Sequence, residues 1–253
     1  MRKILLIILS ITMALPVFAD EVKDSLWAKG VETYSEGNFD EALESFTSLE
    51  NLGYASPELY YNIGNCYFKK ENYIGKSILY YERALISDPS FDDAENNLAL
   101  AQEFTLDRID VVPEFVLLTW TKQFRDCLSS NSWAYISVVL FALVAIFLLL
   151  FRFSRSVALR KTSFSIAIIA FVFAVISFIF SASLNKKMNS QDEAIVMMPV
   201  TSVKSSPSSS QSSLFIIHEG TKVEILEELG DWSRIELSDG RQGWIVSKDM
   251  EII

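Results

Sequence analysis

YYNIGNCYFKKENYIGKSILYYERALISDP, residues 60–89, sets the architecture of the N-terminal region, because its pattern also occurs upstream. The upstream copy reads LWAKGVETYSEGNFDEALESF, residues 26–46. Gly64 lies 34 residues after Gly30 in the aligned copies. Self-similarity at a period of this length indicates stacked supersecondary units. We therefore expect repeated helix–turn–helix units in this region.

A third, partial copy reads FDDAENNLALA, residues 91–101, and places Asn97 35 residues after Asn62. The period and the residue types resemble the tetratricopeptide repeat. In that motif a small residue in the first helix lets the two helices approach closely. The small residues here are Gly30, Gly64 and Ala99. The resemblance implies two repeats and one capping helix within residues 20–111.

Stacked repeats leave a concave face that is lined by side chains of the first helices. The resemblance implies that this face binds an extended peptide. The candidate groove residues are Tyr61, Asn62, Asn65, Lys69 and Asn97. An asparagine amide offers a donor and an acceptor, which suits a peptide backbone. The alternative is that Asn62 and Asn97 only join neighbouring helices.

Three apolar runs indicate export and membrane insertion. Residues 1–19 have a basic start and a short apolar core, which is typical of a cleaved signal peptide. An uncleaved anchor is the alternative. Residues 132–151 and 162–184 are long enough to cross the hydrocarbon core of a bilayer. Each should be a helix, because a chain in lipid must satisfy its own backbone hydrogen bonds.

The short segment between these spans, residues 152–161, is rich in basic side chains although the whole chain has a net charge of −10. The basic residues are Arg152, Arg155, Arg160 and Lys161. Cationic loops stay on the cytoplasmic side of a membrane. We therefore predict a two-span protein of the bacterial inner membrane, with a cytoplasmic loop and with both large regions in the periplasm.

The two outer regions are acidic. Residues 20–112 carry 19 acidic and 7 basic side chains, and residues 185–253 carry 11 and 7. A surface of this sign repels nucleic acid, which we exclude as a partner. Cys66 and Cys127 would both lie in an oxidising compartment. The sequence leaves open whether they form a disulfide.

Residues 112–131 connect the repeats to the first span. Apolar and polar side chains alternate here, and Trp120 is suited to a membrane–water interface. Two interpretations are equally open. The segment is a helix that lies on the bilayer surface and contacts lipid, or it is a simple linker.

The C-terminal residues 192–253 predict a small all-β domain. The stretch HEGTKVEILEELGDWSRIELSDGRQGWI, residues 218–245, alternates apolar and polar side chains between turn residues. It resembles bacterial SH3-like domains, which bind proteins or cell-wall peptides. The resemblance makes the serine-rich residues 205–213 a loop of the barrel rather than a linker. Trp232 is the candidate contact residue, and packing within the barrel is the alternative.

The order of these parts resembles the BatE (Bacteroides aerotolerance) family. The resemblance implies a role in tolerance of oxygen or of envelope stress. It also implies partners with von Willebrand A domains and a MoxR-type ATPase. The expected fold class is a multi-domain membrane protein with α-helical repeats, a two-helix transmembrane hairpin and an SH3-like barrel.

The sequence contains no recognisable catalytic motif. His218 is the one histidine, so a nucleophile–histidine pair has a single candidate base. We expect neither a metal nor a cofactor, and we predict a protein that is not an enzyme. The leading hypothesis is a membrane-anchored scaffold that binds proteins through the repeats and the SH3-like domain. The alternative is a cell-wall sensor or anchor that binds peptidoglycan through the SH3-like domain.

Overall fold

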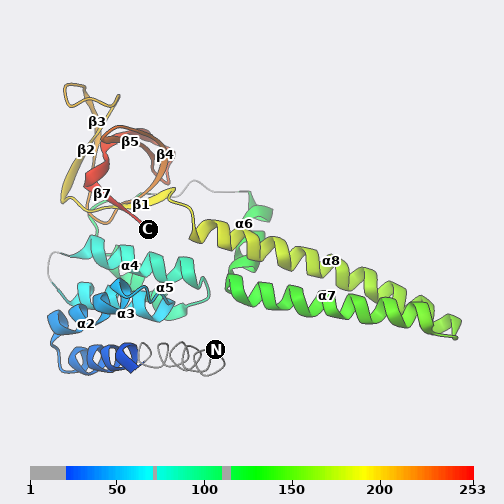
Figure 1. Cartoon of the computed structure of the whole chain (residues 1–253). Helices are drawn as coiled ribbons and strands as arrows, with labels where there is room; N and C mark the ends of the chain where they lie inside the picture. The colour runs from blue at the N-terminus through cyan, green and yellow to red at the C-terminus, as the bar shows by residue number, and fades with distance from the viewer. Residues whose placement is uncertain (1–20, 71–72, 110–114) are drawn as a thin grey trace, which may run out of the picture.

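The computed structural model describes residues 21–70, 73–109 and 115–253 (Figure 1). The predicted signal peptide, residues 1–19, lies outside these residues, as do residues 110–114. The described chain has three parts. A helical unit and a β-domain lie next to each other, and two long helices extend away from both (Figure 1).

The helical unit begins with a helix over residues 21–35. The helices that follow are α2 (Phe39–Asn51), α3 (Pro57–Lys69), α4 (Ile74–Ser87) and α5 (Asp92–Gln102). Gly37 and Gly53 have positive φ angles of 85° and 77°, which allow the tight turns before α2 and α3. Ser56 caps α3, because its hydroxyl accepts a hydrogen bond from the Leu59 amide at 3.1 Å.

Two successive helix pairs repeat the same contact. A Cβ added to Gly30 would lie 2.7 Å from the ring of Phe46 on α2, and one added to Gly64 would lie 2.7 Å from the ring of Tyr81 on α4. Both rings are fully buried. The glycines therefore let an aromatic ring of the second helix lie directly on the backbone of the first. Ala99, the third small residue, is exposed on α5.

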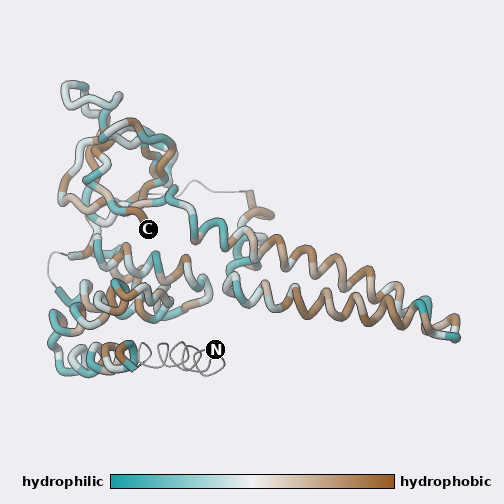
Figure 2. Tube along the Cα trace, in the orientation of Figure 1, coloured by the Kyte–Doolittle hydropathy of each residue, from teal (hydrophilic) through white to brown (hydrophobic). Residues whose placement is uncertain are grey.

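A short helix, α6 (Val116–Asp126), leads into two long ones, α7 (Ser130–Phe153) and α8 (Val157–Met188). By length and composition, both α7 and α8 are able to cross a membrane. In Figure 2 the traces of α7 and α8 run side by side and are mostly brown, with hydrophilic residues near the turn that joins them. The connection is shorter than the predicted loop, since only residues 154–156 lie between the helices.

Small side chains allow α7 and α8 to pack closely. The buried small residues of α8 are Ser163, Ala167, Ala170, Ala174 and Ser177. They recur at intervals of three and four residues and so form one stripe along the helix. Ser137 of α7 donates a hydrogen bond to the carbonyl of Ala174 at 3.1 Å. Most of the large apolar side chains of both helices are exposed, whereas Trp133 of α7 and Leu184 of α8 are buried.

The β-domain is one antiparallel sheet with the strand order β3-β2-β6-β5-β4-β1-β7. The strands are β1 (Glu193–Val196), β2 (Val200–Lys204), β3 (Ser213–His218), β4 (Lys222–Leu229), β5 (Trp232–Glu236), β6 (Gln242–Val246) and β7 (Met250–Ile252). A 3-10 turn, Ser247–Asp249, precedes β7. The serine-rich residues form the loop between β2 and β3, as predicted. The sheet curls around a core that includes Val203, Ile217, Ile235 and Ile245.

We expect Gly64→Val to destabilise the helical unit by about 1–3 kcal/mol, because the new side chain collides with the Tyr81 ring. Helix propensity favours valine over glycine, so propensity cannot cause this loss. Ala99→Val is the matched control, because Ala99 is the equivalent residue of α5 and is exposed. Thermal unfolding of the detergent-solubilised chain, followed by circular dichroism, compares the two. Equal melting temperatures would contradict the packing argument.

Candidate functional site

The groove candidates lie on two neighbouring helices. They are Tyr61, Asn62, Asn65 and Lys69 on α3, and Asn97 on α5. Asn65 is only 9% exposed, and its Oδ1 accepts hydrogen bonds from the Tyr81 hydroxyl at 2.7 Å and from Asn97 Nδ2 at 2.8 Å. Asn97 Nδ2 also donates to the Tyr61 hydroxyl at 3.2 Å. Asn65 and Asn97 therefore join α3, α4 and α5.

Burial raises the pKa of the Tyr81 hydroxyl, so this group stays protonated and donates its bond at neutral pH. The network is thus a fixed part of the helical core. Asn62 is half-buried and Lys69 is exposed. Tyr61 and Asn97 are half-buried as well, so Lys69 is the most exposed of the five candidates.

Trp232 lies at the start of β5, opposite Val246 of β6. Ser233 and Ile235 are fully buried, so the alternating Trp232 and Arg234 point to the outer face of the sheet. Trp244 is the cross-strand neighbour of Arg234 on this face. Both tryptophans are half-buried. The outer face of β5 and β6 therefore presents two aromatic rings beside a guanidinium group, a surface able to bind a ligand through stacking and charge.

The β-domain is docked on the helical unit, which the sequence did not predict. Ile195 and Met197 pack in the same apolar cluster as Ile78 and Tyr80 of α4. The carboxylate of Glu219 accepts a hydrogen bond from the Gly75 amide, in the first turn of α4, at 2.8 Å. An acidic side chain at this place also complements the positive end of the helix dipole.

Charged groups continue this interface along α4. Lys222 Nζ lies 2.8 Å from Glu82 Oε2 and 3.1 Å from Glu193 Oε2. Burial lowers the pKa of Lys222, but the two carboxylates outweigh it, so the pKa is raised and the ammonium group stays charged. Arg83 donates to the carbonyl of Ile252 at 2.8 Å. Both ends of the β-domain sequence are thus tied to one helix.

Asp107 lies in the segment after α5 and binds the β-domain. Its carboxylate accepts hydrogen bonds from the His218 amide at 2.6 Å and from the Thr221 hydroxyl at 2.8 Å, and it lies 2.8 Å from His218 Nδ1. Burial alone would raise the pKa of Asp107, but the bonds from His218 and Thr221 lower it overall. His218, the sole histidine of the sequence, therefore has a structural partner.

One sequence signal pointed to this interface. Residues 78–81 of α4 are four consecutive apolar side chains, and all four are buried. A helix with apolar residues on more than one face is covered on more than one face. The signal shows that α4 has a second partner, but it does not identify the β-domain as that partner.

The basic residues expected to fix the topology cluster at the far end of the long helices. Arg152 lies in the last turn of α7, Arg155 in the connection, and Arg160 and Lys161 in the first turns of α8. The guanidinium of Arg160 lies 5.3 Å from the Phe151 ring centroid, a cation–π distance.

Cys66 and Cys127 are both free thiols. Burial raises the pKa of Cys66 to about 12, so this thiol is protonated and packs as a small apolar side chain. Within the described ranges, no group of three or more His, Cys, Asp or Glu residues is arranged to hold a metal ion.

Comparison with known families addresses the β-domain. Residues 199–251 match the bacterial SH3 domain family. The C-terminal domain of this chain is a bacterial SH3 domain. The match includes the outer face with Trp232 and the interface residues Glu219 and Lys222. The match covers the β-domain and does not include the helical unit.

A curated protein of Bacillus subtilis (strain 168), YrvJ, is 32% identical to the chain over 77 residues. Its name describes it, provisionally, as an N-acetylmuramoyl-L-alanine amidase. The similarity covers 29% of this chain and 15% of that relative. The chain thus spans a small part of the curated relative that it matches.

We expect Asp107→Asn to weaken the docking by about 1–3 kcal/mol, because an amide cannot replace the charged acceptor. The folded-state pKa of Asp107 is lower than the ordinary value of 3.8, so its carboxylate stabilises the fold above that pH. The contribution disappears as the pH falls through the folded-state pKa.

Thermal unfolding of the full chain at neutral pH and in acid measures this difference. The control is Asp231→Asn, which removes an exposed carboxylate from the turn between β4 and β5. A loss for Asp107→Asn that persists unchanged in acid would argue against the docking role of the carboxylate.

Proposed function

We propose that this chain is a non-enzymatic, membrane-anchored adaptor that binds proteins through its helical groove and its SH3 domain. The observation that carries the proposal is the place where the SH3 domain packs on the helical unit. The SH3 domain covers α4, whereas the groove candidates lie on α3 and α5. One domain therefore holds the other without occupying the groove.

The repeated glycine–ring contacts support the assignment of the helical unit as tetratricopeptide repeats. Gly30 with Phe46 and Gly64 with Tyr81 recur at the spacing that the sequence pattern predicts. Repeats of this kind present a concave surface to extended peptides. The exposed Lys69 and the half-buried Asn62 then supply polar contacts to the peptide.

The apolar helices α7 and α8 support membrane anchoring, with the basic end in the cytoplasm. In this orientation the helical unit and the SH3 domain both lie in the periplasm of a bacterial inner-membrane protein, after a signal peptide. Anchoring two binding surfaces at one place raises their local concentration, so weak contacts act together. From the resemblance to the BatE family we infer a role in an aerotolerance or envelope-stress complex, with von Willebrand A-domain proteins and a MoxR-type ATPase as candidate partners.

We expect the double variant Asn62→Arg, Lys69→Glu to recover about tenfold less partner, the effect of losing about 1.4 kcal/mol of binding free energy. The measurement is an affinity pull-down of the tagged chain from detergent-solubilised membranes, with quantified partners. Glu44→Arg on α2 is the control, because Glu44 is exposed and lies on a second helix of a pair. Partner recovery that matches the control would argue against docking in the groove.

The second candidate is a cell-wall sensor or anchor, and the SH3 match favours it. The relative's name refers to N-acetylmuramoyl-L-alanine, a constituent of peptidoglycan. The outer face with Trp232, Arg234 and Trp244 has the aromatic and cationic groups that a peptide or sugar ligand requires. In this alternative the SH3 domain binds peptidoglycan, and the α7–α8 pair reports the binding through its basic end.

Sedimentation with purified, insoluble peptidoglycan separates the two candidates. For the cell-wall function we expect the full chain to sediment, and Trp232→Ala to weaken this about tenfold by removing a stacked ring. Ser209→Ala, in the exposed serine-rich loop, is the control. For the adaptor function the wild-type chain stays in the supernatant.

A further inference from the structure

An apolar groove of about 780 Å³ lies between α6 and the adjoining ends of α7 and α8. All three helices contribute to its walls. Representative lining residues are Trp120 and Phe124 of α6, Trp133 and Ile136 of α7, and Phe173 and Ile176 of α8. Apart from Thr121 and Ser177, every lining side chain is apolar or aromatic. The groove therefore suits a hydrocarbon rather than a polar ligand.

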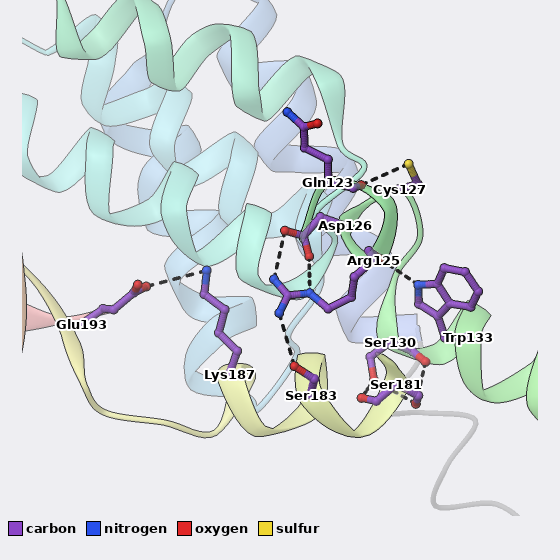
Figure 3. A network of polar contacts seen from close by, with 10 residues as sticks. All are labelled: Gln123, Arg125, Asp126, Cys127, Ser130, Trp133, Ser181, Ser183, Lys187 and Glu193. Atoms are coloured by element: carbon purple, nitrogen blue, oxygen red, sulfur yellow. Dashed lines mark hydrogen bonds and ion pairs between the residues drawn. The ribbon is translucent and has the colours of Figure 1, made fainter. Parts of the chain in front are cut away.

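Polar contacts hold α6 against the long helices and so keep the groove formed (Figure 3). The guanidinium of Arg125 pairs with the carboxylate of Asp126 at 2.6 Å and donates to the Ser183 hydroxyl of α8 at 3.3 Å. The Trp133 indole of α7 donates to the carbonyl of Arg125 at 2.8 Å. Phe124 also contacts Phe180, with ring centroids 6.1 Å apart. Thus α6 is fixed to both α7 and α8.

The groove lies at a definite depth if α8 spans the membrane. Phe180 lies 19 positions along α8 from Lys161, which is near the basic end. At a rise of about 1.5 Å per residue, this distance is about 29 Å, close to the ~30 Å thickness of the hydrocarbon core. Phe173 and Ile176 then lie in the half of the core that is far from the basic end. That half holds the acyl chains of the periplasmic leaflet.

The surface of α6 supports the same depth. Leu117, Leu118 and Trp120 are between 57% and 64% exposed. Such side chains on a surface helix match the boundary between lipid tails and headgroups, where tryptophan is enriched. In a bilayer the acyl chains are the solvent for apolar protein surface, and the groove is continuous with the lipid-facing sides of α7 and α8.

We propose that one acyl chain of a periplasmic-leaflet phospholipid occupies this groove, wedged between α6 and the α7–α8 pair. The inference rests on the proposed membrane anchoring. The bound chain fills the space between α6 and the α7–α8 pair.

Native mass spectrometry tests the proposal on the full chain, purified in mild detergent from membranes. We expect one tightly retained adduct with the mass of a phospholipid. Ile136→Trp fills the groove, and we expect it to lower the adduct fraction about tenfold. Val138→Trp is the matched control, since Val138 is two residues away on the same helix, exposed, and not part of the groove. Thr121→Trp fills the groove from the exposed side of α6, which keeps the test valid if Ile136→Trp fails to fold.

Equal phospholipid retention in the groove-filled and control variants would overturn the proposal. An adduct with the mass of a free fatty acid, or a dimer that replaces the adduct and is lost in Ile136→Trp, would overturn it as well. Alkaline extraction of membranes distinguishes a failure of the lipid proposal from a failure of the proposed membrane anchoring. A chain that is released by alkali is not anchored, whereas a chain that resists extraction but retains no lipid contradicts only the groove assignment.

Discussion

The contact between α4 and the β-domain is the interaction on which the rest of the arrangement depends. Ile195 and Met197 complete the apolar cluster of the helical unit, so neither domain has a closed surface at this place without the other. Removing the SH3 domain would expose the second apolar face of α4 to water. The two domains therefore form one body, and α3 and α5 have a fixed orientation relative to the SH3 outer face.

A short connection joins this body to the long helices, because only residues 189–192 lie between α8 and β1. A linker of this length allows little independent movement. The charged pairs at the interface between α4 and the β-domain restrict the orientation of these two domains. Partly buried ion pairs such as Lys222 with Glu82 and Glu193 contribute little net stability, but they penalise any orientation that separates them.

Local patterns in the sequence predicted most of the separate elements. The spacing of Gly30 and Gly64 predicted two equivalent helix pairs, and uninterrupted apolar composition predicted the two long helices. Alternation and turn residues predicted a small β-domain, and its identity as a bacterial SH3 domain is confirmed. These features follow from residues within a few turns or strands of one another, which is the range that periodicity covers.

The arrangement of the elements could not be predicted in the same way, because it depends on pairs that are distant in the sequence. Asp107 meets His218, and Gly75 meets Glu219, more than 100 residues further along the chain. No periodicity links such positions. The predicted peptide groove shows the same limit at a single residue. Asn65 has the residue type and position of a peptide contact, yet its carbonyl oxygen is occupied by Tyr81 and Asn97. A side chain's chemistry is readable from sequence, but whether that chemistry is free for a partner depends on which neighbours the fold brings to it.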